Sequence, residues 1–218
     1  ESARLAIGYA IDRESLVTDL HEGARATSQL FPEGAPGFDP ALDEEFGYDP
    51  DKATELLAEA GFPDGFDFNI TVLGQPDEDQ IAIQSQLAEV GITMNFVIAT
   101  STDQLFAAVN TDPMLWGPFA VGAQPQGFIA GVVYGGFMNI QQAKEPEIEA
   151  SLGAALGATG DVQEQALTDL NRAITANAWY IPVYEDFTYV GFNADKVSEP
   201  AFAGANTYLV LSEITPAS

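Results

Sequence analysis

Two strand patterns joined through one helical pattern constrain the fold of this chain most tightly. Apolar residues alternate with polar ones over residues 66–72 and again over residues 92–98, which is the period of a strand with one buried face. Between them, Ile83 and Leu87 lie at helical spacing, and Gly91 follows at the position where a helix ends. Strands linked through such a helix form a crossover, so the sequence predicts a sheet that is at least partly parallel.

Helical patterns flank this crossover on both sides. Residues 3–21 carry apolar residues at helical spacing, and the sequence predicts a single helix there that ends near Gly23. Asp49 and Pro50 are the residue types preferred at an N-cap and at the first helical position, so a helix is predicted from them to Ala60. The remaining expected elements are a helix capped by Ser101 or Thr102, a helix over residues 145–156, a longer helix capped by Asp161, short strands over residues 181–184 and 188–192, and a surface loop over residues 32–50.

Residues 113–143 contain no charged side chain, in a chain of 218 residues whose net charge is −26. Aromatic rings and side-chain amides are interleaved there with glycines. Rings supply contact area, amides supply orienting hydrogen bonds, and glycine lets the backbone approach a ligand, so this composition suits the wall of a binding pocket. An uncharged core segment between two elements is an equally good interpretation.

The charge balance excludes several classes of function. The chain has 33 acidic and 7 basic residues and therefore repels phosphate backbones and anionic headgroups, so we expect no nucleic-acid partner. A hydrophobic content of 46% is enough for a packed core, which argues against disorder. The absence of cysteine excludes disulfides and thiolate metal sites, and no apolar window reaches the length needed to span a bilayer.

The inventory of catalytic residue types is thin. The one histidine, His21, is followed by Glu22 and Gly23, which is not the zinc-binding HExxH pattern, so we expect it to end a helix. No serine lies in a G-x-S-x-G elbow, and no phosphate-binding glycine loop occurs. We therefore expect no catalytic residue, metal site or cofactor. Glu185 and Asp186 follow a strand pattern that could end at a cleft, although a plain turn is the commoner role of such a pair.

Four segments of the chain together carry a family resemblance. They are residues 4–14 (RLAIGYAIDRE), residues 48–62 (YDPDKATELLAEAGF), residues 86–92 (QLAEVGI), and residues 170–184, which end in IPVY. In the same order they resemble the R-x-A-x-x-Y-A-I-D-R-E helix, the Y-D-P-E-K-A run, the Q-L-x-x-I-G-I motif and the P-x-I-P-L-Y strand of one family. This is extracellular solute-binding protein family 5, the oligopeptide, dipeptide and nickel class that serves ABC importers.

The resemblance implies an α/β fold, a periplasmic-binding-protein-like (type II) lobe with a mixed, partly parallel sheet flanked by helices. It implies that residues 1–196 form the second, C-terminal lobe of a two-lobed protein, and that residues 197–218 return to a first lobe that precedes this sequence. The implied partners are a small-molecule or peptide solute and the membrane permease of an ABC importer. The implied location is extracellular or periplasmic, with a lipid anchor on the full-length form.

The uncharged segment falls where the family carries a ligand-facing W-x-x-D-x-x-D-P stretch, whose first aspartate pairs with the amino terminus of a bound peptide. Val121 or Gly122 stands in place of that aspartate, and Gln124 stands in place of the second. An ammonium group would be desolvated there without a partner, so we expect a neutral polar solute such as an oligosaccharide, or a blocked or apolar peptide. The predicted wall residues are Trp116, Phe119, Gln124, Gln126, Phe128 and Tyr134, with Asn139 and Glu185 as further candidates.

The function predicted from the sequence is therefore non-enzymatic capture of a small extracellular solute between two lobes that close around it. Two other classes stay open. A carboxylate-dependent hydrolase needs two acids about 5 to 10 Å apart in a cleft. A stand-alone docking or sensory module would present an exposed apolar face where the first lobe would otherwise sit.

Overall fold

The computed structural model describes residues 1–108, 111–112, 114, 116–118, 121, 125–136, 139, 143–186 and 192–197. Within these ranges the chain folds as helices together with a pair of eight-residue strands and a pair of two-residue strands, the mixture of α and β structure that the sequence predicts. None of the helices in these ranges is both long and apolar enough to cross a membrane.

The amino-terminal helix predicted over residues 3–21 is two helices. Helix α1 spans Ser2–Tyr9, and helix α2 spans Arg13–Leu20. Asp12 starts the second helix because its side chain accepts a hydrogen bond from the Ser15 backbone N–H at 3.1 Å, an N-cap arrangement that needs non-helical backbone. The prediction of one continuous helix is wrong, since the apolar spacing runs through a break that only the cap residue marks.

Two Asp-Pro pairs start the next helices. Helix α4 spans Pro50–Glu59, and the Asp49 side chain caps it by accepting a backbone N–H of the first turn at 2.9 Å, which confirms this helix. Helix α3, Pro40–Glu45, begins in the same way, with Asp39 accepting a backbone N–H at 3.0 Å. The expectation of a loop over residues 32–50 is therefore wrong for this part, because its Asp-Pro pair carries the same start signal.

The predicted crossover is present and parallel. Strand β2, Phe66–Leu73, pairs in parallel with strand β3, Ile92–Ala99, along the full length of both. Helix α5, Glu78–Glu89, links them and starts with a capping box in which Asp77 and Gln80 each accept the other's backbone N–H. The prediction of a partly parallel sheet is confirmed.

Further helical elements follow along the described chain. The helix expected over residues 145–156 is confirmed, and Ser101, one of the two predicted caps, accepts the Gln104 N–H at 3.3 Å. Asp161 is not a cap but the first helical residue, because Gly160 occupies the N-cap with φ +60, a conformation that glycine adopts freely. These elements are α6 (Thr102–Ala108), α7 (Pro125–Phe128), the π-helix η1 (Ile129–Tyr134), α8 (Pro146–Gly157) and α9 (Asp161–Ala176).

A short antiparallel ribbon joins distant parts of the chain. Strand β1, Arg25–Ala26, pairs with strand β4, Tyr184–Glu185. The strand expected over residues 181–184 is therefore shorter and lies later in the chain, because Pro182 has no N–H to donate to a partner. Residues 188–191 of the other expected strand lie outside the described residues.

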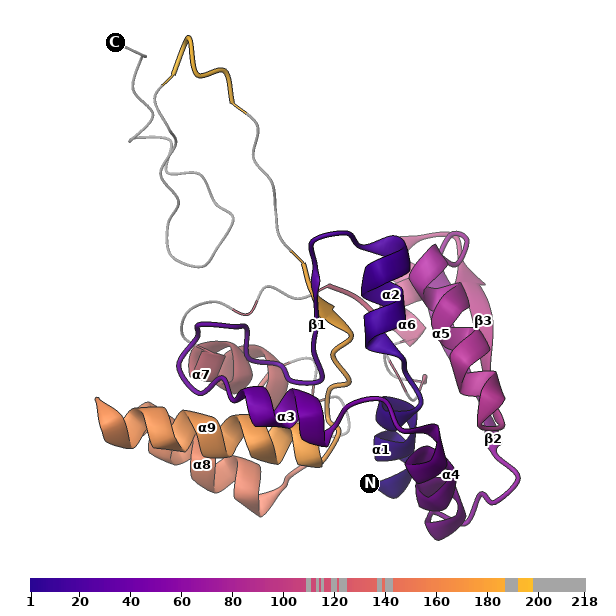
Figure 1. Cartoon of the computed structure of the whole chain (residues 1–218), viewed down its shortest axis with the longest axis horizontal. Helices are drawn as coiled ribbons and strands as arrows, with labels where there is room; N and C mark the ends of the chain where they lie inside the picture. Colours follow the sequence, from indigo (N-terminus) through magenta and orange to yellow (C-terminus); the bar gives the residue numbers. More distant parts are fainter. Residues whose placement is uncertain are drawn as a thin grey trace.

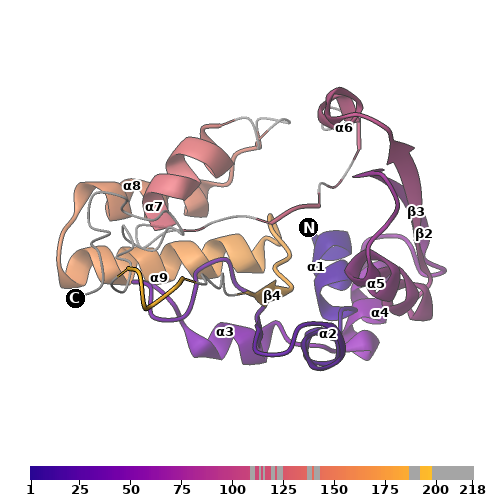
Figure 2. The same ribbon diagram turned by 90° about the horizontal axis from the view of Figure 1, so that it is seen from above.

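Buried apolar side chains form two clusters, which we call the first core and the second core. The first core gathers side chains of α1, α2, α4, β2, α5 and β3, with Leu57, Leu87 and Ile92 almost fully buried. The second core is built mainly by η1, α8 and α9, together with Phe31. Figure 1 and Figure 2 show the two corresponding halves side by side, with the β1–β4 ribbon between them. The ribbon therefore lies where the halves meet.

The guanidinium of Arg13 is buried where α1 and α2 meet. Its Nε donates to the Pro182 carbonyl at 2.8 Å, and its Nη1 donates to the carbonyls of Gly8 at 2.9 Å and Ile11 at 3.3 Å. Burial lowers the pKa of Arg13 to about 10, so the group stays protonated at neutral pH. A desolvated charge thus holds the chain around residue 182 against the amino-terminal helices.

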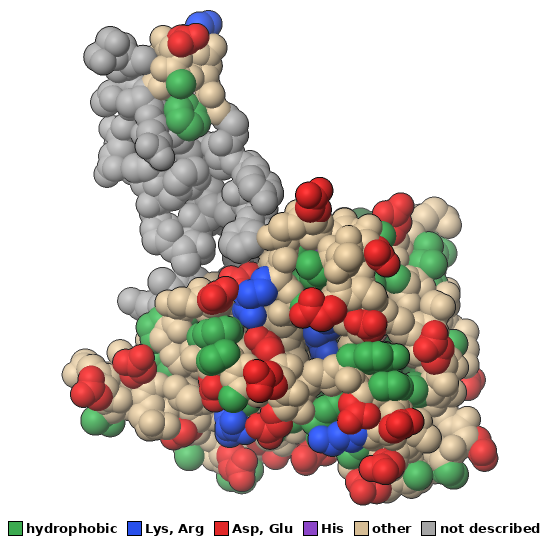
Figure 3. Space-filling view, in the orientation of Figure 1, with side chains coloured by type: hydrophobic (Ala, Val, Ile, Leu, Met, Phe, Trp, Pro, Cys, Tyr) green, Lys and Arg blue, Asp and Glu red, His purple; other side chains and the backbone are tan. Residues whose placement is uncertain are grey.

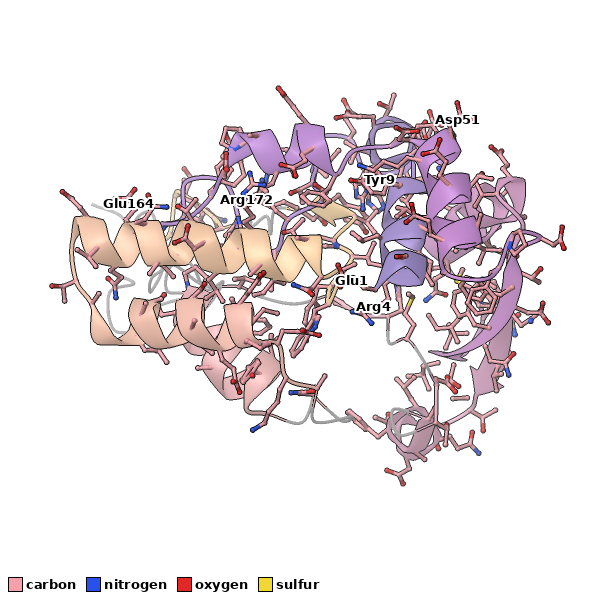
Figure 4. The ribbon with its side chains drawn as sticks, turned by 90° about the horizontal axis from the view of Figure 1, so that it is seen from below. Glu1, Arg4, Tyr9, Asp51, Glu164 and Arg172 are labelled. Carbon is pink, nitrogen blue, oxygen red and sulfur yellow. The ribbon has the colours of Figure 1, made fainter. Side chains whose placement is uncertain are left out.

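Carboxylates are spread over the surface rather than gathered at one place. Figure 3 shows Asp and Glu side chains over both halves, with few Lys and Arg among them. The arginines bind within the molecule: Arg25 and Arg172 pair with carboxylates, whereas Arg4 and Arg13 donate to backbone carbonyls. Figure 4 shows Arg172 on α9 directed toward α3, where it meets Glu45 at 2.7 Å. No group of three metal-ligating side chains occurs in the described part of the chain.

Gly65 gives a direct test of how closely the starts of β2 and β3 approach each other. It has φ +84, and a Cβ added there would collide with the Gly91 carbonyl. We expect Gly65→Ala to lower the free energy of unfolding by roughly 3 kcal/mol or more, measured by urea denaturation. Gly61→Ala is the matched control, because Gly61 has φ +87 but nothing within 4 Å of the added atom, and its expected cost is about 1 kcal/mol. Equal losses in both variants would contradict the close approach.

Candidate functional site

The structure describes six of the eight predicted site residues. Phe119 and Gln124 lie outside the described residues. The six described ones are Trp116, Gln126, Phe128, Tyr134, Asn139 and Glu185.

Trp116 lies against the first half of the molecule. Its side chain is half-buried and packs on the first core, together with Met114. Part of the ring stays accessible, so contact with the core leaves surface for a further partner.

Gln126, Phe128 and Tyr134 lie on the consecutive helices α7 and η1. Phe128 and Tyr134 pack against the second core, and the Tyr134 ring stacks on Trp179 with 5.7 Å between centroids and 9° between planes. Gln126 Oε1 is shielded from solvent and accepts no hydrogen bond within the described part of the chain. The predicted wall is therefore divided, with Trp116 on the first core and these three residues on or beside the second.

The Tyr134 hydroxyl keeps its proton. Burial, with the neighbouring Glu149 carboxylate, raises the pKa of Tyr134 to about 12. A tyrosine is already uncharged at neutral pH, so the raised pKa extends to higher pH the range in which the hydroxyl can donate a hydrogen bond.

Asn139 joins the end of η1 to Ala143. Its Nδ2 donates to the carbonyls of Tyr134 at 3.0 Å and Ala143 at 2.8 Å, and its Oδ1 accepts the Ala143 N–H at 2.8 Å. The side chain is 9% exposed. These contacts give Asn139 a structural role, and its place in the wall stays a prediction.

Glu185 belongs to a polar cluster beside the β1–β4 ribbon. Its carboxylate accepts from Arg25 Nη2 at 2.9 Å and from the Glu33 N–H at 3.1 Å, and Arg25 Nη1 also donates to Asp43 at 2.9 Å. Although burial opposes ionisation of Asp43, hydrogen bonds from Ser28 and its neighbours hold the pKa of that carboxyl below its usual range. Glu185 thus has protein partners already, and its role toward a ligand stays a prediction.

Sequence reasoning missed a second polar cluster. His21 ends α2 as expected, and its Nε2 lies 2.7 Å from the Asp79 carboxylate, which also accepts from the Tyr184 hydroxyl at 2.8 Å. The rings of His21 and Tyr184 stack with 4.2 Å between centroids. Nothing in the local patterns around these residues points to this contact, since α2, α5 and β4 are far apart in sequence.

One small cavity adjoins the buried Arg13. It has a volume of about 20 Å³ and is lined by residues that include Tyr9, Ser28, Thr175 and Tyr180. Such a space holds about one water molecule, so it is too small for a solute.

A family model described as "Bacterial extracellular solute-binding proteins, family 5 Middle" matches residues 1–139. The match covers more than half of the chain. The chain belongs to this family. Membership in family 5 confirms the resemblance that the motifs at residues 4–14 and 48–62 indicate.

Two relatives align with different shares of the chain. Heme-binding protein A of Haemophilus influenzae is 25% identical over an alignment of 194 residues, which covers 83% of this chain and 35% of that protein. The dipeptide-binding protein of Escherichia coli is 28% identical over an alignment of 102 residues, which covers 43% of this chain and 19% of that protein. The family 5 chain therefore spans about a third of the length of the first relative.

Solved structures share the fold. The dipeptide-binding protein from Pseudoalteromonas in complex with Met-Leu matches with a TM-score of 0.75 and 20% identity, over 99% of this chain and 45% of that one. HbpA2 from Haemophilus parasuis matches with a TM-score of 0.73 and 20% identity, over 85% of this chain and 39% of that one. These matches confirm the predicted periplasmic-binding-protein-like (type II) α/β fold.

Replacing Asn139 tests whether its hydrogen bonds stabilise the folded chain. We expect Asn139→Ala to lower the free energy of unfolding by about 2 kcal/mol, because two backbone carbonyls and one N–H lose their partner. Asn95→Ala, at an exposed position of β3, serves as control and should cost about 0.5 kcal/mol or less in thermal unfolding. If both variants unfold like the parent chain, the contacts of Asn139 with Tyr134 and Ala143 do not stabilise the fold.

Proposed function

We propose that this chain is part of the substrate-binding component of an ABC importer and captures a small extracellular solute between two lobes. The family 5 match over residues 1–139 is the observation that carries the proposal. Two of its relatives are a heme-binding and a dipeptide-binding protein, which agrees with solute capture. The permease of the importer is the proposed partner in the membrane, and a lipid anchor on the full-length form is part of the proposal.

The share of the chain that aligns supports a proposed division of the protein into two lobes. Nearly all of this chain aligns with less than half of the dipeptide-binding structure, 99% against 45%. We assign residues 1–196 to the second, C-terminal lobe and residues 197–218 to a segment that returns to the first lobe. A site built between lobes closes by hinge motion, so neither lobe alone provides all of its contacts.

The proposed solute carries no free ammonium group. Trp116, Gln126, Phe128 and Tyr134 are all uncharged at neutral pH. An ammonium group brought against such a wall would lose its hydration without gaining a carboxylate, at a cost of several kcal/mol. An oligosaccharide or a blocked or apolar peptide fits the combination of rings and amides better.

A carboxylate-dependent hydrolase is not favoured by the described contacts. The Glu185 carboxylate already accepts hydrogen bonds from Arg25 Nη2 and from the Glu33 N–H. A catalytic carboxylate has to face the substrate with a second acid across a cleft, and these contacts turn Glu185 toward the protein instead. We therefore propose that the protein binds its solute and does not hydrolyse it.

The first test is native mass spectrometry of the two-lobed protein, purified without denaturation. We expect a defined extra mass from a retained solute. Gln126→Ala should weaken retention about tenfold, because a buried ligand donor would lose its acceptor. Gln165→Ala, at an exposed position of α9, is the matched control and should leave retention unchanged. Equal retention in both variants would remove Gln126 from the wall, and absence of any retained mass would count against solute capture.

A second test uses the 218-residue chain alone. Because half of a cleft supplies half of the contacts, we expect calorimetry to detect no binding of the solute weighed above at micromolar concentration. Micromolar binding by this chain would place the whole site within the described lobe and would contradict the two-lobe proposal.

A further inference from the structure

Residues 177–186, which we call the joint segment, leave the second core at the end of α9 and cross to the first core. Figure 2 shows this path from α9 to β4. Helices of the first half hold the segment by its backbone. Asn177 O accepts from Arg4 Nη2 at 2.9 Å, and Pro182 O accepts from Arg13 Nε at 2.8 Å.

The two residues of β4 then reach to different partners. Successive side chains on a strand point to opposite faces. Tyr184 donates to Asp79 at the start of α5 and stacks on His21 at the end of α2, both in the first half. Glu185 instead accepts from Arg25 on β1.

The Arg25 contact extends into the other half. Arg25 also donates to Asp43 on α3, at 2.9 Å. Figure 1 shows α3 beside α9, on the side of the second core. Strand β4 is therefore bound to both halves of the molecule, through the adjacent side chains of Tyr184 and Glu185.

The joint segment also touches the predicted wall. Trp179 lies within the segment, and its ring stacks on Tyr134 of η1. Trp116, the wall residue on the other side, packs on the first core, to which Tyr184 is anchored. One end of the chain from Trp179 to Tyr184 therefore contacts the wall residue Tyr134, and the other end packs on the first core, which also holds Trp116.

We propose that the joint segment sets the spacing between the two halves of the wall, and that His21, Asp79 and Tyr184 are positioning residues for solute affinity. They act through the placement of Trp116 and Tyr134 and do not touch the solute. This inference rests on the proposed function for its consequence in binding, whereas its structural part stands without a solute.

The spacing is measured by electron-electron double resonance between two nitroxide labels. The chain has no cysteine, so Ile81→Cys on α5 and Val162→Cys on α9 provide the labelling sites, at positions that are 54% and 69% exposed. Tyr184→Phe keeps the ring on His21 and removes only the hydroxyl that binds Asp79. We expect the distribution of label distances to broaden about twofold in this variant.

Tyr48→Phe is the matched control. Tyr48 is 46% exposed, and its hydroxyl makes no hydrogen bond within the described part of the chain, so its removal should leave the label distances unchanged. Asp79→Asn is a second variant that disturbs the same cluster from α5 and should broaden the distribution as Tyr184→Phe does. Circular dichroism identifies a variant that has simply unfolded. A distribution as narrow as that of the parent chain in both folded variants would overturn the inference.

Binding is measured separately on the two-lobed protein, with an N-acetylated dipeptide as probe. We expect Tyr184→Phe to weaken its binding about tenfold and Tyr48→Phe to leave it unchanged. If the parent protein fails to bind this probe, a blocked dipeptide is not its solute, and the label distances alone decide the role of the joint segment. Broadened distances with unchanged affinity would overturn the positioning role.

Discussion

A buried positive charge is the constraint on which the architecture depends. Arg13 is surrounded by carbonyl oxygens rather than by a paired carboxylate, and three of them accept its protons. A guanidinium taken out of water is tolerated only where its N–H groups are satisfied, so the helix corner at Gly8 and Ile11 and the chain at Pro182 have to meet there. That meeting places Pro182 of the joint segment beside α2, and β4 begins two residues later within the same segment.

Local signals account for most of the fold that the sequence predicts. The Asp49 cap, the alternation in β2 and β3 and the glycine after α5 act within a few residues, and they fix helices and a parallel crossover. The break at Asp12 was missed because the apolar period continues through it. The β1–β4 ribbon was missed because two residues on each side are too few to show a period, and the partners are 160 positions apart.

The candidate site, like the fold, was predictable from the sequence only in part. Composition identifies an uncharged, ring-rich segment, and Trp116 and Tyr134 are indeed placed by packing on the two cores, although their contact with a solute stays a prediction. The partners of Glu185 were not predictable, because an acidic residue after a strand looks the same whether it faces a cleft or an arginine. Arg25 reaches it only through the tertiary fold, and the same holds for His21 and Asp79.

The bond from Arg13 to Pro182 joins positions 169 residues apart. Contacts of such separation form late, since a long loop has to close before they add stability, whereas β2, α5 and β3 pair over a short span of chain. The crossover unit therefore needs only short loops to close, and α1 and α2 have α4 and α5 to pack on within the same stretch of chain. During synthesis, the Arg13 guanidinium lacks its Pro182 acceptor until residue 182 has been made, so this buried charge is the last part of the first half to be satisfied.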